Sequence, residues 1–186
     1  IHLGHQKVIK EAKKKAINNK LPFGIMTFEP VPVMFFNKKI KNHRINNLDQ
    51  KIKSLKKLKI DFCIIIKFNK NFSNMSSDNF IKKIIHKKLN CKFLIISKNF
   101  RFGKNREGDI FKLKKNENKF SYKTIIANPL KKNNKILSSS IIRKNISKGK
   151  IETANRLLGR EWSIVGKVKK GYQRGRKIGF PTCNIK

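Results

Sequence analysis

The chain has 186 residues, enough to bury one good core and part of a second domain, because domains commonly contain about 100–150 residues. No apolar stretch approaches the roughly 20 residues of a membrane-spanning helix, so we expect a soluble protein with no membrane partner. The cysteines are odd in number and lack metal-ligand spacing, which predicts reduced thiols in a cytoplasmic protein, with Cys63 in the core.

The net charge of +37 suggests nucleic-acid binding as one interpretation. Only eight of the 47 basic residues are Arg, whereas specific phosphate and base contacts favour the Arg fork, and the lysines are spread along the whole chain. We therefore expect a solvated Lys-rich surface that adsorbs RNA weakly and has no specific nucleic-acid partner. A basic RNA-binding protein remains an alternative.

Apolar runs alternate with helical patterns, which is typical of an α/β domain with a mainly parallel sheet and crossover helices. The first helix is predicted by apolar residues that share one helical face, namely Val8, Ile9, Ala12, Ala16 and Ile17. Further helices are expected around 48–58, 80–89, 141–143 and 151–158, and strands at 23–28, 62–66, 93–96 and 122–127.

Two segments interrupt this alternation. Residues 98–109 form a polar, Gly-containing loop after a strand, and ligands bind at that end of the strands in open α/β sheets. From Trp162 onward the sequence is β-prone, so we place a domain boundary near residue 160. The predicted domains are 1–160 and 161–186, and the second is too short to complete a barrel.

The segment His2-Leu3-Gly4-His5 precedes the first predicted helix. It places two imidazoles beside the free N–H donors of a helix start, and Gly4 would let the backbone approach a phosphate closely. Such a site attracts anions. The alternative for two histidines at this place is helix capping or surface exposure.

The run Ser138-Ser139-Ser140 precedes another helix, and Arg143 follows one turn later. Hydroxyls, free N–H groups and an Arg can converge on one oligophosphate, although a Ser run is usually only a helix cap.

Together the two motifs resemble the HxGH nucleotidyltransferase superfamily. Further motifs resemble the bacterial bifunctional riboflavin kinase/FMN adenylyltransferase (FAD synthetase) family: Thr27-Phe28-Glu29-Pro30-Val31-Pro32, Asn99-Phe100-Arg101-Phe102-Gly103 with Glu107-Gly108-Asp109, Leu158-Gly159-Arg160, and 175–184 (GRKIGFPTCN). The resemblance implies a Rossmann-like domain followed by the truncated start of a β-barrel riboflavin kinase domain.

The activity implied is adenylyl transfer from ATP to FMN, giving FAD and pyrophosphate, with riboflavin phosphorylation to FMN in the parent protein. In this reading His2, His5 and Arg143 are catalytic, and Ser139 and Ser140 join them in binding ATP. Another HxGH nucleotidyltransferase with a different phosphomonoester acceptor remains an alternative.

The resemblance also implies flavin contacts from Pro30, Pro32, Phe36, Asn99 and Phe102. For Phe102 the alternation with Phe100 equally favours a core position at a strand edge.

In the second predicted domain, Thr182 and Asn184 would belong to an incomplete Mg²⁺–ATP site of the kinase. In the first domain, Mg²⁺ would accompany ATP through the phosphates, with no protein cage. The expected partners are small-molecule substrates, and the oligomeric state is left open.

The sequence also departs from the family pattern. Val31 stands where the family usually has His, and Ser140 replaces the usual Thr but keeps the hydroxyl. The given residues do not include the family's first strand with its G-x-F-D-G segment or most of the kinase domain, and we expect a chain cut at both ends. We therefore expect a fragment destabilised by the loss of a central strand.

Overall fold

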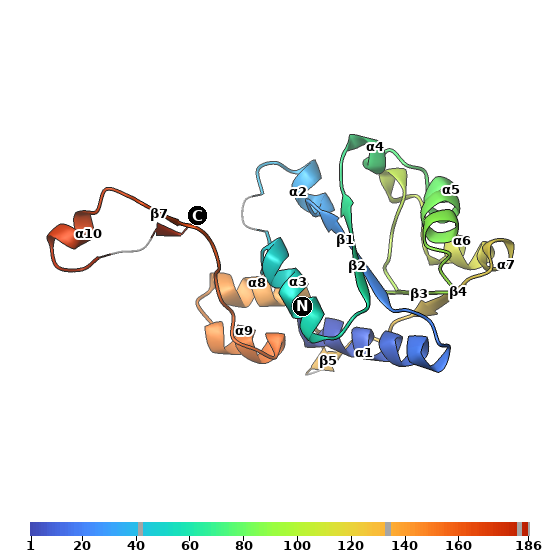
Figure 1. Cartoon of the computed structure of the whole chain (residues 1–186), viewed down its shortest axis with the longest axis horizontal. Helices are drawn as coiled ribbons and strands as arrows, with labels where there is room; N and C mark the ends of the chain where they lie inside the picture. Colours follow the sequence, from blue (N-terminus) through green and yellow to red (C-terminus); the bar gives the residue numbers. More distant parts are fainter. Residues whose placement is uncertain (41–42, 133–134, 182–183, 186) are drawn as a thin grey trace.

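The computed structural model describes residues 1–40, 43–132, 135–181 and 184–185 and is a mixed α/β structure (Figure 1). Its first half contains the elements α1 (Leu3–Asn18), β1 (Gly24–Glu29), α2 (Pro32–Phe36), α3 (Leu48–Lys57), β2 (Phe62–Lys67), α4 (Lys70–Ser73), α5 (Ser77–Asn79) and the π-helix η1 (Phe80–Lys88).

The elements that follow are β3 (Phe93–Ile96), the 3₁₀ turn η2 (Lys104–Arg106), α6 (Ile110–Lys115), α7 (Glu117–Phe120), β4 (Lys123–Ile126), β5 (Lys131–Lys132), β6 (Lys135–Ile136), α8 (Ser139–Ser147), α9 (Ile151–Leu158), β7 (Val168–Lys169), α10 (Arg174–Lys177) and β8 (Asn184–Ile185). The five predicted helices (α1, α3, η1, α8 and α9) and the four longer strands occur in the predicted order, whereas the short helices α2, α4, α5, α6, α7 and α10 were not predicted.

The four longer strands pair in parallel, but they form two separate pairs where we predicted one mainly parallel sheet. Strand β1 pairs with β2 from Gly24 opposite Phe62, and β3 pairs with β4 from Phe93 opposite Lys123. Among the described residues no strand joins these two pairs. A largely apolar cavity of about 600 Å³ separates them, lined by residues of β1 on one side and of β3 on the other. Figure 1 shows the two pairs apart.

Two hydrophobic cores hold the chain together. The first packs η1 against β3, α6 and the loop after β3, with Ile81, Ile85 and Leu113 almost completely buried. The second packs α8 against α9 through Ile142, Ala154 and Leu158. The second core lies next to the start of α1, because Leu3 packs against it.

Two side chains are less buried than the apolar pattern predicted. Helix α1 buries Ile9, Ala12 and Ala16, but Ile17 is 65% exposed near the end of the helix. Cys63 is only half-buried, because β2 has β1 on one side and no described strand on the other.

The segment after α9 leaves the main body of the chain (Figure 1). Trp162 still packs against the second core, and its Nε1 donates to the carbonyl of Ile45 at 3.0 Å. Beyond it, β7 and β8 form a two-residue antiparallel pair and α10 is a single turn. The boundary near 160 and the start of a barrel therefore stay predictions.

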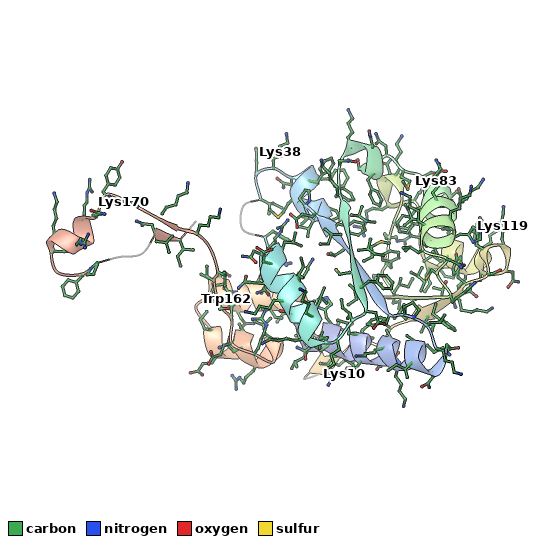
Figure 2. All side chains as sticks on the ribbon, in the orientation of Figure 1. Lys10, Lys38, Lys83, Lys119, Trp162 and Lys170 are labelled. Atoms are coloured by element: carbon green, nitrogen blue, oxygen red, sulfur yellow. The ribbon has the colours of Figure 1, made fainter. Side chains whose placement is uncertain are left out.

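The charged side chains are distributed over many elements of the chain. In Figure 2 the labelled Lys10, Lys38, Lys83, Lys119 and Lys170 lie on separate parts of the structure. This spread is consistent with the solvated Lys-rich surface expected from the sequence. None of the helices within the described residues is both long and apolar enough to cross a membrane.

Candidate active site

The two histidines of the HLGH segment form a reciprocal cap at the start of α1. His2 is the N-cap, and its Nδ1 accepts the backbone N–H of His5 at 3.3 Å. The Nδ1 of His5 accepts the backbone N–H of His2 at 3.5 Å, and the ring centroids are 3.8 Å apart. The capping interpretation is therefore confirmed.

This cap also fixes which ring nitrogen can act on a ligand. Because each Nδ1 accepts a backbone N–H, each neutral ring carries its proton on Nε2. Burial lowers the pKa of His2 to about 4. The pKa of His5 is lowered as well, first by loss of hydration and then by the nearby charges of His2 and Lys51. At neutral pH both rings are uncharged and offer Nε2–H as a donor.

The lowered pKa of His2 predicts acid sensitivity. The unfolded chain takes up this proton near pH 6.5, whereas the folded chain resists it until about pH 4. The free energy of unfolding should therefore fall as the pH drops from about 6.5 towards 4. Denaturant titrations across this range should show a shallower fall for His2→Asn, which keeps a capping side chain but does not titrate. An identical pH slope in both proteins would contradict the assignment.

Gly4 serves a different purpose from the one predicted. A Cβ at this position would lie 3.0 Å from Cε1 of His2 and 3.4 Å from the carbonyl oxygen of Leu137. The missing side chain therefore makes room for the His2 ring and for the chain entering α8. Gly4 is buried. We therefore do not assign it the role of letting a phosphate approach the backbone.

The second predicted phosphate motif lies at the start of α8. Ser138 is the N-cap, and its Oγ accepts the backbone N–H of Ile141 at 3.4 Å. Arg143 donates to Oγ of Ser140 at 3.0 Å, so its guanidinium is held over the first turn. The carbonyl oxygen of Leu137 would lie 3.4 Å from a Cβ at Gly4, which places this helix start beside that of α1. The structure thus brings together two motifs that are more than 130 residues apart in the sequence.

The Leu158-Gly159-Arg160 segment packs against the HLGH segment and the first turn of α1. Gly159 ends α9 in the left-handed region, and a Cβ there would lie 2.4 Å from Cδ2 of Leu3. Gln6 of α1 donates to the carbonyl of Leu158 at 3.2 Å. The position of Leu3, and hence of the adjacent His2, depends on glycine at 159.

This contact gives a prediction with a matched control. Gly149 has the same φ of +69° as Gly159, but a Cβ there meets nothing within 4 Å. Gly149→Ala should cost about 1 kcal/mol of unfolding free energy, from the left-handed backbone alone. Gly159→Ala should cost roughly 2–4 kcal/mol, because the clash with Leu3 is added. Equal losses in chemical denaturation would show that the Leu3 contact is unimportant.

The Thr27–Pro32 motif ends β1 and begins α2. Pro32 is the first residue of α2, and Val31 is an N-cap that makes no side-chain hydrogen bond. Pro30 and Pro32 are half-buried. Phe36 at the end of α2 is 70% exposed and lies 5.8 Å from the ring of Phe68. An exposed aromatic face therefore stands next to the motif, as flavin stacking would require.

The two residues of the loop after β3 for which flavin contacts were predicted differ in burial. Asn99 is exposed and free of the core. Phe102 is only 8% exposed, with its ring 5.3 Å from that of Phe80 and stacked 5.6 Å from that of Phe100. The structure favours the core position for Phe102, because its ring already packs against aromatic neighbours.

Three basic side chains near the HLGH segment were not predicted. Lys51 of α3 donates to Oγ1 of Thr27 at 2.6 Å, and Arg44 forms an ion pair with Glu29. Arg160 donates to Oδ1 of Asn46 at 2.7 Å. The sequence does give one sign of these contacts. Thr27 and Glu29 are polar residues in an otherwise apolar strand, which indicates polar or charged partners for them.

Of the two predicted kinase residues, the structure describes Asn184 alone. Thr182 lies outside the described residues, and Asn184 is exposed in β8. Within the part of the chain that the structure describes, no group of three His, Cys, Asp or Glu side chains could hold a metal ion.

The structure is that of a mixed α/β protein in which the starts of α1 and α8 adjoin each other. The sequence profile of the FAD synthetase family matches residues 1–141, and that of riboflavin kinase matches residues 158–186. The chain therefore belongs to the FAD synthetase family.

Similar proteins are named bifunctional riboflavin kinase/FMN adenylyltransferase. The protein of Buchnera aphidicola subsp. Schizaphis graminum is 44% identical over the whole chain, and those of Haemophilus influenzae and Escherichia coli K12 are 34% and 30% identical. This chain spans about 60% of the length of these relatives.

A solved structure from Streptococcus pneumoniae, described as a macrolide-efflux protein, has a TM-score of 0.81 and 29% identity. The match covers 100% of this chain and 60% of that one.

Proposed function

We propose that residues 1–160 catalyse adenylyl transfer from ATP to FMN, giving FAD and pyrophosphate. The observation that carries this proposal is the meeting of the His-capped start of α1 with the Ser-capped start of α8, where Leu137 contacts Gly4. Helix starts present free N–H donors to anions, and the family membership supplies the substrates.

In the proposed reaction, an oxygen of the FMN phosphate attacks the α-phosphorus of ATP. A new P–O bond forms as the bond from the α-phosphorus to the bridging oxygen breaks, and the electron pair leaves with pyrophosphate. The Nε2–H groups of His2 and His5 donate to phosphoryl oxygens as their charge grows. Arg143 supplies a fixed positive charge from the start of α8, with Ser139 and Ser140 beside it.

The acceptor side is proposed to lie by α2 and the loop after β3. Pro30, Pro32 and Phe36 would flank the flavin, and Asn99 would orient it. Mg²⁺ would be held by the ATP phosphates, since the described residues provide no carboxylate cluster for it. Residues 161–186 are proposed to begin a riboflavin kinase domain, whose Thr182 and Asn184 would bind Mg²⁺–ATP.

The test is formation of FAD from FMN and ATP by the protein that the whole reading frame encodes, followed by chromatography. Parallel reactions offer other phosphomonoesters, and RNA binding is measured across a salt series. FAD as the preferred product supports the proposal. Preference for another acceptor would favour a different nucleotidyltransferase. Tight RNA binding at physiological salt without FAD formation would favour a nucleic-acid-binding protein.

A further inference from the structure

Lys51 is a half-buried cation without a carboxylate partner in the described residues. Its Nζ donates to Oγ1 of Thr27 at 2.6 Å, near the carboxyl end of β1. The nearby carboxylate of Glu29 is already bound by Arg44. A neutral hydroxyl orients an ammonium group but does not balance its charge.

The surroundings of Lys51 are positively charged as well. Arg44 is close enough that its charge lowers the pKa of Lys51, after burial as the larger cause. The Nε atoms of Arg44 and of Arg160 are both buried without a hydrogen-bond partner among the described residues. Buried donors of this kind normally have an acceptor, and an oxygen of a bound anion could serve as one.

The cationic region adjoins the candidate active site. Arg160 follows Gly159, where a Cβ would lie only 2.4 Å from Cδ2 of Leu3 in the HLGH segment, and the charge of Lys51 contributes to lowering the pKa of His5. Arg160 bonds to Asn46, the residue before the N-cap of α3, while Lys51 lies one turn into the same helix. An anion bound between these groups would therefore lie next to the histidine donors.

We propose that Lys51, positioned by Thr27, binds a phosphoryl oxygen of the substrates, with Arg44 and Arg160 as further cations of the same site. This inference rests on the proposed function and extends it to residues that no sequence motif indicated. The oxygen belongs either to the nucleotide triphosphate or to the acceptor phosphomonoester. The two sources present the same phosphoryl oxygen. If Lys51 binds the triphosphate, its loss should raise the KM for ATP, and if it binds the acceptor, its loss should raise the KM for FMN.

The test compares three variants of the protein encoded by the whole reading frame: Lys51→Met, Lys51→Arg and Lys53→Met. Lys53 is an exposed lysine on the same helix and serves as the control. Lys51→Met should lower kcat/KM for FAD formation by about 10–100-fold, as expected for a lost hydrogen bond to a charged group. Lys51→Arg should keep most of the activity, and Lys53→Met should match the wild type. A raised KM for ATP or for FMN identifies the source of the oxygen.

Calorimetric binding of inorganic pyrophosphate provides a readout independent of turnover. Lys51→Met should bind pyrophosphate at least ten-fold more weakly than the wild type, while Lys51→Arg and Lys53→Met bind it normally. Wild-type activity in Lys51→Met, or equal losses in Lys51→Met and Lys51→Arg, would overturn the proposal. If the wild type makes no FAD, the proposed function fails, and the pyrophosphate comparison alone decides whether Lys51 binds anions.

Discussion

Replacing His5 with Ala should lower FAD formation from FMN and ATP by about 10²–10³-fold, the usual loss when one donor to a developing charge is removed. The loss should fall mainly on kcat, because Nε2–H of His5 is proposed to act most strongly when the α-phosphoryl group carries its greatest charge. Steady-state kinetics with both substrates varied would measure it.

The controls for His5→Ala separate chemistry from folding. His86 lies on η1 against Phe120, so His86→Ala removes an imidazole elsewhere and should leave turnover unchanged. Riboflavin phosphorylation by the whole protein should survive His5→Ala. Equal loss of both activities would indicate a folding defect instead.

Arg143→Ala should lower kcat/KM for adenylyl transfer by about 100-fold, equivalent to roughly 2.7 kcal/mol. The guanidinium is held over the first turn of α8 by Ser140 and is proposed to bind the nucleotide phosphates. Stopped assays at several ATP concentrations would show both a raised KM and a reduced kcat.

Helix α9 offers a matched control for Arg143. Arg156 donates to Oγ1 of Thr153 at 3.3 Å, the same spacing of three residues as Arg143 and Ser140, but on an exposed surface. Arg156→Ala removes the same charge and a comparable local bond, and its kinetics should match the wild type. Unchanged kinetics in Arg143→Ala would remove this residue from the site.

The order of helices and strands was predictable because each depends on local spacing of apolar residues. Helices α1 and α3 could be predicted from the spacing of their own apolar residues, and strands β1 to β4 from their short apolar runs. Neither prediction required knowledge of contacts between residues far apart in the sequence. The joining of strands into sheets was not predictable in the same way. Strand pairing depends on which strands lie side by side, and the described residues contain none between β1 and β3.

Only those residues of the candidate site that belong to sequence motifs could be predicted. His2, His5, Ser139 and Arg143 lie in recognisable motifs, and the structure brings their helix starts together. Lys51 is one of 47 basic residues and sits in an ordinary amphipathic helix. What distinguishes it is the contact with Thr27, 24 positions earlier, and that contact exists only in the folded chain.

The separation of the two strand pairs bears on how a further strand could bind between them. The edges of β1 and β3 that face the apolar cavity carry backbone groups with no partner strand in the described residues. Free strand edges act as templates for a strand from another molecule. Here an incoming strand would satisfy two ladders at once and exclude water from the cavity. A strand that occupies this place, whether from the same polypeptide or from another molecule, would therefore join the two pairs into one sheet.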